Sequence, residues 1–224
     1  MSVRIAALVL AAGSSQRFGG RPKQFEDLGG ITVLQRAVRI FDRDGIDEVW
    51  VVTSAALLDR TRDVLADEGI AGVVLGGDLR ADSTRLGLEA LGPQITHVLV
   101  HDAARPLVPA AVVADCIARL ADADVVATVV EPRDSVLIID DDRLRTPERS
   151  TIRLHQTPQG FKRSVLAEAW ERLDGDAPTD DVTAVLRAFP DASVALVPGH
   201  RHSLKITDAD DLLAVRAFLG AAGE

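Results

Sequence analysis

The chain alternates short apolar runs with segments that carry apolar residues at helical spacing, and this alternation is what most constrains its fold. Apolar runs of strand length occupy residues 5–10, 48–53, 72–77, 97–102 and 124–130. Helix-periodic segments lie between them at 32–41, 57–68, 83–91 and 109–120. Thr32 is placed to cap the first of these helices, and Asp82 or Ser83 the third. Apolar, β-branched strands separated by helices predict an α/β fold, a doubly wound and mostly parallel sheet covered on both faces.

The alternation breaks between residues 131 and 159. An apolar run at 136–139 is followed by three consecutive aspartates at 140–142 and then by a charged run. Because three aspartates favour a turn, we predict a β-hairpin arm over 132–156; the alternative is a disordered loop. An apolar strand exposed on such an arm is an edge that attracts other chains. The arm is therefore expected to pack on a partner subunit.

The regular pattern resumes after the arm. Helical spacing returns at 163–173 and 180–189, a strand is predicted at 193–197, and a final helix begins near residue 208. No internal repeat, low-complexity tract or linker separates these segments. We therefore expect 1–224 to form a single domain from which the arm projects.

Composition excludes several classes of function. The chain has 224 residues, 47% of them apolar, and a net charge of −9, which argues against a nucleic-acid partner because such binding needs a broad basic surface. No apolar run approaches the ~20 residues that cross a bilayer, so we expect no membrane partner. The first apolar run is interpreted as a strand and not as a signal peptide, since a basic loop follows it. One cysteine allows no internal disulfide, which suits a cytoplasmic location.

The opening segment, ALVLAAGSSQRFGGRPKQF at 7–25, places an unusual loop after the first strand. It supplies small residues and then Arg17, Arg21 and Lys23 with no acid among them. It has neither the glycine spacing of a dinucleotide-binding turn nor the Gly-Lys-Ser/Thr of a P-loop. Close backbone N–H groups together with cations favour phosphate binding. The alternative is a mobile basic surface loop.

Two further polar segments follow strands and should reach the same edge of the sheet. In HDAARP (101–106), Asp102 could order a magnesium ion or a hydroxyl and Arg105 could clamp a phosphate; a local ion pair is the alternative. In GGDLRADS (76–83), the paired glycines would let a base approach the backbone, and an ordinary turn is the alternative. Lys205, in SLKITD, matters only if the chain returns to this edge, as the expected topology suggests.

Other chemically active side chains carry weaker signals. His200 and His202 have no neighbouring cysteine or acidic cluster to complete a metal shell and are interpreted as a polar strand end. Cys116 lies on the apolar face of a helix and is interpreted as a packing residue. No Ser/His/Asp arrangement indicates a nucleophilic mechanism.

The order of these motifs resembles a known family. LAAGSSQRF with RPKQF, GGDLRADS, VHDAARP, TPQGF (157–161), APTDD (177–181) and LKITD (204–208) follow one another as in 2-C-methyl-D-erythritol 4-phosphate cytidylyltransferases. The resemblance implies a Rossmann-like nucleotidyltransferase fold and a homodimer with exchanged arms. It also implies an enzyme of non-mevalonate isoprenoid synthesis that joins a sugar-alcohol phosphate to CTP and releases pyrophosphate.

The resemblance also implies roles for individual residues. The expected catalytic residues are Arg17, Lys23, Lys205 and Asp102. The expected nucleotide-binding residues are Ala11, Ala12, Gly13, Gly77, Asp78, Ser83 and Ala103. The residues expected to bind the second substrate are Arg105, Ser135, Arg149, Thr157 and Thr179. The expected cofactor is Mg²⁺ or another divalent cation, held mainly through the CTP phosphates, with Asp102 as a candidate protein ligand.

The chain departs from the family pattern at four positions. Ser15 replaces a usual glycine, Phe18 a methionine, Ser135 a threonine and Asp181 a glutamate. None of these changes removes a charge, so activity is expected to survive them.

Two rival functions remain open. A ribitol 5-phosphate cytidylyltransferase would share the fold and the CTP site, although the second alanine of HDAARP favours the methylerythritol enzyme. A non-catalytic nucleotide-binding regulator would not need all the charges expected around the α-phosphate.

Overall fold

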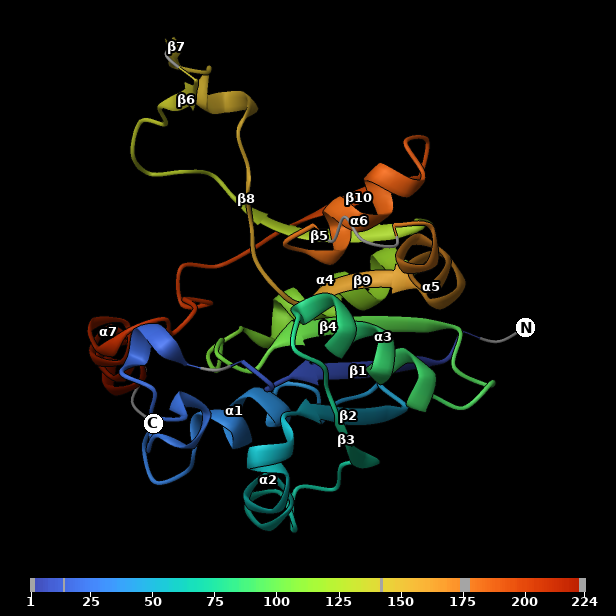
Figure 1. Ribbon diagram of the computed structural model, residues 1–224, viewed down its shortest axis with the longest axis vertical. Helices are drawn as coiled ribbons and strands as arrows, with labels where there is room; N and C mark the ends of the chain where they lie inside the picture. The colour runs from blue at the N-terminus through green and yellow to red at the C-terminus, as the bar shows by residue number, and fades with distance from the viewer. Residues whose placement is uncertain (1–2, 14, 142, 174–177, 222–224) are drawn as a thin grey trace.

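A central sheet organises the protein, whose computed structural model describes residues 3–13, 15–141, 143–173 and 178–221. The sheet runs in the order β10-β5-β9-β4-β1-β2-β3, with β8 paired to β5 (Figure 1). Its strands are β1 (Ile5–Leu10), β2 (Glu48–Thr53), β3 (Gly72–Leu75), β4 (His97–Asp102), β5 (Val125–Val130), β8 (Leu154–His155), β9 (Gln159–Lys162) and β10 (Val194–Pro198). β1 is parallel to both β2 and β4, so the chain winds outward from β1 in two directions and the predicted doubly wound fold is confirmed.

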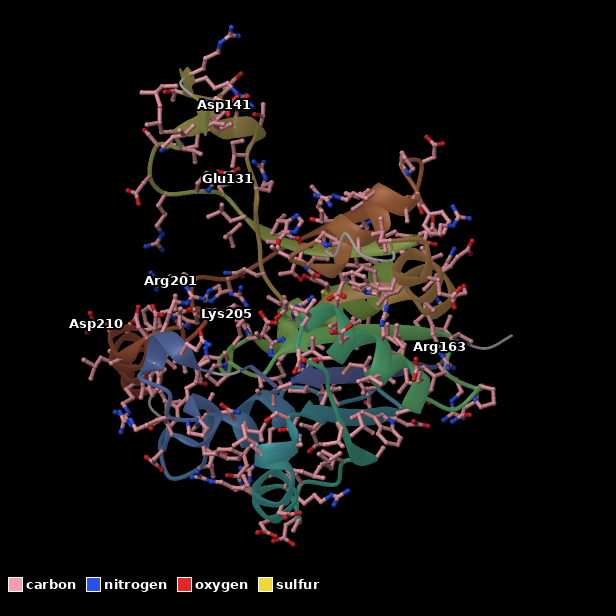
Figure 2. The ribbon with its side chains drawn as sticks, viewed as in Figure 1. Glu131, Asp141, Arg163, Arg201, Lys205 and Asp210 are labelled. Carbon is pink, nitrogen blue, oxygen red and sulfur yellow. The ribbon has the colours of Figure 1, made fainter. Side chains whose placement is uncertain are left out.

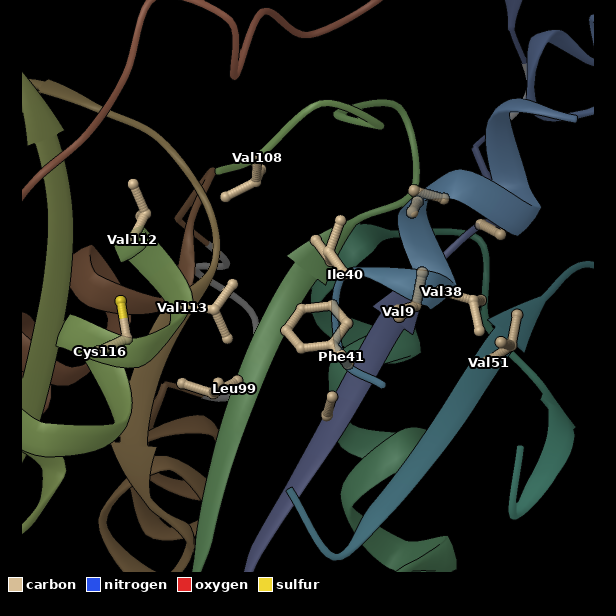
Figure 3. Close-up of a cluster of buried hydrophobic side chains, with 14 of the residues drawn as sticks. Val9, Val38, Ile40, Phe41, Val51, Leu99, Val108, Val112, Val113 and Cys116 are labelled. Atoms are coloured by element: carbon tan, nitrogen blue, oxygen red, sulfur yellow. The ribbon is translucent and has the colours of Figure 1, made fainter. Parts of the chain in front are cut away.

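Helices cover both faces of the sheet because its central strands are apolar on both sides. The helices are α1 (Val33–Arg39), α2 (Leu58–Val64), α3 (Arg80–Ala90), α4 (Ala110–Leu120), α5 (Arg163–Arg172), α6 (Asp181–Ala188) and α7 (Ala209–Ala221). On one face Val9 and Leu99 pack against Phe41, which follows α1, and against Val113, which lies on α4 (Figure 3). On the other face alternate strand residues pack against α3, α5 and α6.

Two strands of the central sheet escaped prediction. β8 lies inside 132–156, the range predicted for the arm, but pairs antiparallel with β5, so the end of that range belongs to the sheet. β9 enters between β4 and β5 and runs antiparallel to both. Its sequence, QGFK, is too short for a periodic signal, and its fit depends on tertiary packing. A Cβ on Gly160 would lie 3.0 Å from Leu120 and 3.2 Å from Leu99, so the close approach of α4 and β4 favours glycine there.

Helix boundaries confirm one predicted cap and correct two other expectations. Thr32 caps α1 in a capping box with Gln35. The expectation that Asp82 or Ser83 caps the third helix is wrong, because α3 already begins at Arg80 and Asp82 accepts a hydrogen bond from the Leu79 backbone N–H at 3.3 Å. The helix predicted over 57–68 is shorter, since α2 ends at Val64.

The predicted arm is present as a hairpin that projects from the body of the molecule (Figure 1). It pairs β6 (Ile138–Asp140) with β7 (Arg143–Arg145) in antiparallel register. Asp141 begins the turn with φ of 50°, and Asp142 lies outside the described residues. Ile139 is 71% exposed and Leu144 66%, so this chain alone leaves the arm's apolar side chains uncovered. None of the described helices is long and apolar enough to cross a membrane.

The last helix ties the C-terminal segment to the opening loop. Leu212, Val215 and Leu219 of α7 form a separate buried cluster with Phe18 and Ile206, among other residues. Phe18 is therefore an apolar anchor of the loop. This packing brings the segment that carries Lys205 toward the N-terminal loop.

Candidate active site

A cavity of about 790 Å³ opens where β1 and β4 end. Leu10 and Asp102, the last residues of these strands, lie opposite each other in the sheet register. The cavity is lined by the opening loop, by the segment after β3, by the end of β4 and by Lys205 and Thr207. The sheet therefore brings together the strand-end motifs that the sequence predicted to converge, at the position where doubly wound folds bind ligands.

The opening loop is fixed by hydrogen bonds of its own residues. The Gln24 side chain, 4% exposed, donates to the Ala11 carbonyl at 3.0 Å and so folds the Lys23 segment back onto the end of β1. Ser15 has φ of 54°, a left-handed conformation that glycine adopts more readily than serine. Its hydroxyl accepts the Lys23 backbone N–H at 3.4 Å. Ser14 lies outside the described residues.

Four cations line the cavity: Arg80 at the start of α3, two residues of the opening loop and one residue of the C-terminal segment. Arg17, Lys23 and Lys205 all belong to its lining. The pKa of Lys23 is lowered, first by burial and then by the neighbouring charges of Lys205 and Arg17. Arg21, the remaining loop cation, is instead 72% exposed and lies 3.9 Å from Glu26. A bound polyanion would reduce the repulsion between these cations, because it would neutralise their charges.

Asp102 stands at the centre of a cationic cluster. Its Oδ2 lies 2.8 Å from Lys205 Nζ and its Oδ1 lies 3.4 Å from Arg80 Nε. Arg105 Nε is 3.7 Å away, so the local pair considered for this motif is present as one part of a larger network. Burial alone would raise the pKa of Asp102, but the surrounding cations outweigh it, Arg80 most strongly, and hold that pKa well below its usual range.

Lys205 returns to the site through a backbone connection. The Ile206 N–H donates to the Ala104 carbonyl at 2.8 Å, and the Ile206 side chain is fully buried. The Arg105 guanidinium donates to the Ser203 carbonyl at 2.7 Å. These contacts hold the segment beside the end of β4, and the expected return of Lys205 to this edge is confirmed.

Close packing explains the paired glycines after β3. A Cβ on Gly76 would lie 2.5 Å from Ser83 Oγ, and one on Gly77 would lie 2.3 Å from Asp82 Cβ. The start of α3 therefore lies directly against this turn. All the residues expected to bind nucleotide line the cavity: Ala11, Ala12, Gly13, Gly77, Asp78, Ser83 and Ala103.

The residues expected to bind the second substrate are more scattered. Thr157 is buried, and its hydroxyl accepts the Asp102 backbone N–H at 3.1 Å and lies 2.9 Å from His101 Nδ1. Thr179 is exposed just before α6. Ser135 and Arg149 lie on the arm, and Arg149 donates to the Arg133 carbonyl at 3.2 Å. Figure 2 shows Asp141 at the far end of this arm, remote from Lys205.

Among the described residues, the cavity lining includes none of the arm and does not include Arg105, Thr157 or Thr179. The residues expected to bind nucleotide thus share one cavity within a single chain, whereas those expected to bind the second substrate do not.

Two site residues were not predicted to have a role. Arg80 lines the cavity and pairs with both Asp102 and Asp181. Asp181 is completely buried. Arg80 sits inside the GGDLRADS motif, but its carboxylate partners lie 22 and 101 positions away. The motif could have drawn attention to Arg80, whereas no local pattern indicates the burial of Asp181.

A doubly wound sheet with a cation-lined cavity at the junction of β1 and β4 defines a nucleotide-binding α/β enzyme. Residues 5–221 match the family model of 2-C-methyl-D-erythritol 4-phosphate cytidylyltransferase. The chain belongs to this family, and is a nucleotidyltransferase.

Individual relatives agree with this membership. Proteins named for that activity from Rhodococcus jostii and Thermobifida fusca are 40% and 34% identical, with 96% of this chain covered and 95% and 93% of theirs. The crystal structure of a 4-diphosphocytidyl-2C-methyl-D-erythritol synthase from Anaerococcus prevotii superimposes with a TM-score of 0.88 at 31% identity. The matched region covers 97% of this chain and 96% of the Anaerococcus prevotii chain.

Proposed function

We propose that this protein transfers the cytidylyl group of CTP to 2-C-methyl-D-erythritol 4-phosphate and releases pyrophosphate. The observation that carries the assignment of roles is the convergence of Arg17, Lys23 and Lys205 on one cavity beside Asp102. A phosphate monoester is already a nucleophile near neutral pH, so the reaction needs no strong base. The obstacle is the approach of two anions and the charge that accumulates on the α-phosphate and the leaving pyrophosphate.

The cations of the cavity answer this requirement. Arg17 and Lys23, on the opening loop, would neutralise the triphosphate. Lys205 lies 2.8 Å from Asp102 in this structure and would turn toward the α-phosphate when nucleotide binds. Because the loop is braced by Gln24 and Phe18, the charges of Arg17 and Lys23 would be held near the triphosphate before the reaction begins, which favours transition-state stabilisation.

Base recognition is assigned to the segment after β3. Gly76 and Gly77 allow the start of α3 to pack directly against this turn, which limits the space there. Asp78 and Ser83 would contact the ribose and cytosine. A small, tightly bounded turn favours a pyrimidine over a larger purine.

A divalent cation fits this site as part of the nucleotide complex. Among the described residues no group of three or more His, Cys, Asp or Glu side chains could hold a metal ion, so we expect the CTP phosphates to supply most of its ligands. Asp102 is the residue that would reach a Mg²⁺ ion bound by CTP phosphates. When bound, the ion would add further charge neutralisation at those phosphates.

The second-substrate site is proposed to form between two subunits. The arm exposes Leu137, Ile139 and Leu144, apolar side chains that a second copy of the chain would cover. In such a homodimer, Arg149 and Ser135 would reach the partner's cavity and bind the phosphate and hydroxyls of the acceptor.

The proposed location is the cytoplasm. Cys116 is free and buried, which suits a reducing compartment of this kind.

The test is pyrophosphate release with CTP and Mg²⁺, with methylerythritol phosphate and ribitol 5-phosphate offered in parallel and the product identified by mass. Release with the former supports the proposal. Release with ribitol 5-phosphate alone would overturn the choice of acceptor but keep the mechanism. CTP binding without release in either reaction would favour a nucleotide-binding regulator.

A further inference from the structure

A carboxylate is fully buried behind the proposed nucleotide site. Asp181, the first residue of α6, is 0% exposed and accepts a hydrogen bond from the Trp170 indole N–H at 3.1 Å. Its other oxygen forms an ion pair with the guanidinium of Arg80. A buried carboxylate is unfavourable unless it is paired, so Asp181 fixes the position of its partner.

Arg80 links this buried group to the cavity. It is the first residue of α3, its side chain is 26% exposed, and it belongs to the cavity lining. One nitrogen of its guanidinium faces Asp181 and another lies 3.4 Å from Asp102 Oδ1. Burial lowers the pKa of Arg80, but the two carboxylates outweigh this effect and raise it above its ordinary value. Arg80 therefore remains a cation throughout the working pH range.

The two oxygens of Asp102 have different partners. Oδ1 faces Arg80, which is anchored, whereas Oδ2 faces Lys205, whose side chain is 41% exposed. Held at Oδ1, the carboxylate keeps a defined orientation, and its Oδ2 can guide Lys205 while the ammonium turns toward a bound phosphate. Without Arg80, the carboxylate could rotate toward Lys205 or Arg105 and misplace the lysine.

We propose that Arg80 is a positioning residue for nucleotidyl transfer: anchored by Asp181, it orients the Asp102 carboxylate and through it the Lys205 ammonium. This inference rests on the proposed function of the cavity. The competing explanation is that Arg80 only joins α3 to α6. The two explanations differ in their consequences, because a structural clamp would affect folding while positioning would affect turnover in the folded enzyme.

The sharpest test is Arg80→Lys. A lysine keeps the charge that Asp181 requires, but its single ammonium cannot present separate donors to two carboxylates as a guanidinium does. Since the buried carboxylate has the greater need of a counter-charge, the lysine should remain with Asp181 and leave Asp102 Oδ1 unpaired. We expect kcat to fall at least tenfold, with the thermal midpoint changed little.

Binding is measured separately, by calorimetric titration of CTP and Mg²⁺ into the enzyme without the acceptor. The dissociation constant for CTP should change less than threefold, because Arg17 and Lys23 are untouched. Glu68→Gln is the matched control: Glu68 is 6% exposed and pairs with Arg39 at 2.8 Å, but it lies outside the cavity lining. This control should leave both kcat and the CTP dissociation constant unchanged.

Asp181→Asn provides a second, independent variant. Asparagine keeps the shape and can still accept the Trp170 hydrogen bond, but it removes the charge that anchors Arg80. It should lower kcat as Arg80→Lys does, and the double variant should lose little more than either single one. Unchanged kcat in folded Arg80→Lys, or additive losses in the double variant, would overturn positioning. Inactive wild-type enzyme would instead overturn the proposed function.

Discussion

Replacing Lys23 by alanine tests whether the opening loop acts as a phosphate cradle during the reaction. Lys23 lines the cavity together with Arg17 and Lys205, and its lowered pKa reflects burial and the repulsion of these two cations. Bound triphosphate would convert this repulsion into attraction. The lysine should therefore contribute most when negative charge on the phosphates is greatest, which is in the transition state.

The magnitude follows from the position of the charge. A cation about 4 Å from a phosphate charge interacts by about 4 kcal/mol at an effective dielectric of ~20. Removing one preorganised donor from a transition state typically costs ~2.7–4 kcal/mol. Because Arg17 and Lys205 remain and share the charge, we expect a loss of about 2–4 kcal/mol. This corresponds to a fall in kcat of roughly 30- to 1,000-fold.

The assay is the initial rate of pyrophosphate release at saturating CTP and acceptor, with the thermal midpoint measured in parallel. Arg21→Ala is the matched control, since Arg21 lies on the same loop but is 72% exposed and outside the cavity lining. It should retain nearly full activity. The thermal midpoint of Lys23→Ala should not fall, because the change removes like-charge repulsion. Equal losses in the two variants, or an unchanged rate in Lys23→Ala, would refute the cradle.

Further predictions concern the arm and the buried histidine. Arg149→Ala should raise the KM for the acceptor at least tenfold while calorimetry finds the CTP dissociation constant unchanged; equal loss of both would refute the arm assignment. Ile139→Asp should shift a dimer toward monomer in light scattering, because Ile139 is 71% exposed in one chain, whereas Asp140→Asn should not. Burial above all lowers the pKa of His101 to about 3, whereas the unfolded chain binds this proton near pH 6.5. The free energy of unfolding should therefore fall by up to ~1.4 kcal/mol per pH unit as the pH drops from about 6.5 toward 3. When the free energy of unfolding is measured by urea titration at several pH values, it should depend less on pH in His101→Gln than in the wild type.

The sheet could be predicted because its strands are determined by local composition. β1, β2 and β4 have the predicted bounds, since buried parallel strands are rich in apolar, β-branched residues over a run of strand length. β9 could not be found this way: it has four residues and is held by its neighbours on both sides. α3 began earlier than expected because Asp82 acts from inside the first turn, where it accepts the Leu79 N–H.

The cavity was predictable for a topological reason. Parallel strands that wind outward from β1 end at one edge, so the loops after them must meet whatever their sequence. The same rule places the opening loop beside Asp102, since Leu10 and Asp102 are opposite each other in the sheet. Lys205 required one further contact, the Ile206 N–H to the Ala104 carbonyl, which links residues far apart in the sequence.

Charge partners were not predictable, because side-chain reach rather than strand order selects them. Asp181 begins a helix, where an acidic residue is ordinarily exposed and interacts with the helix dipole. Here it is fully buried, since Trp170 covers it and Arg80 reaches it from 101 positions earlier. The pairing also changes what Asp102 can do: a strand-end acid judged by its neighbours would pair with Arg105, yet Arg80 and Lys205 lie closer. Such a network is defined only when four segments meet, so its function must be tested by variants that change one contact at a time.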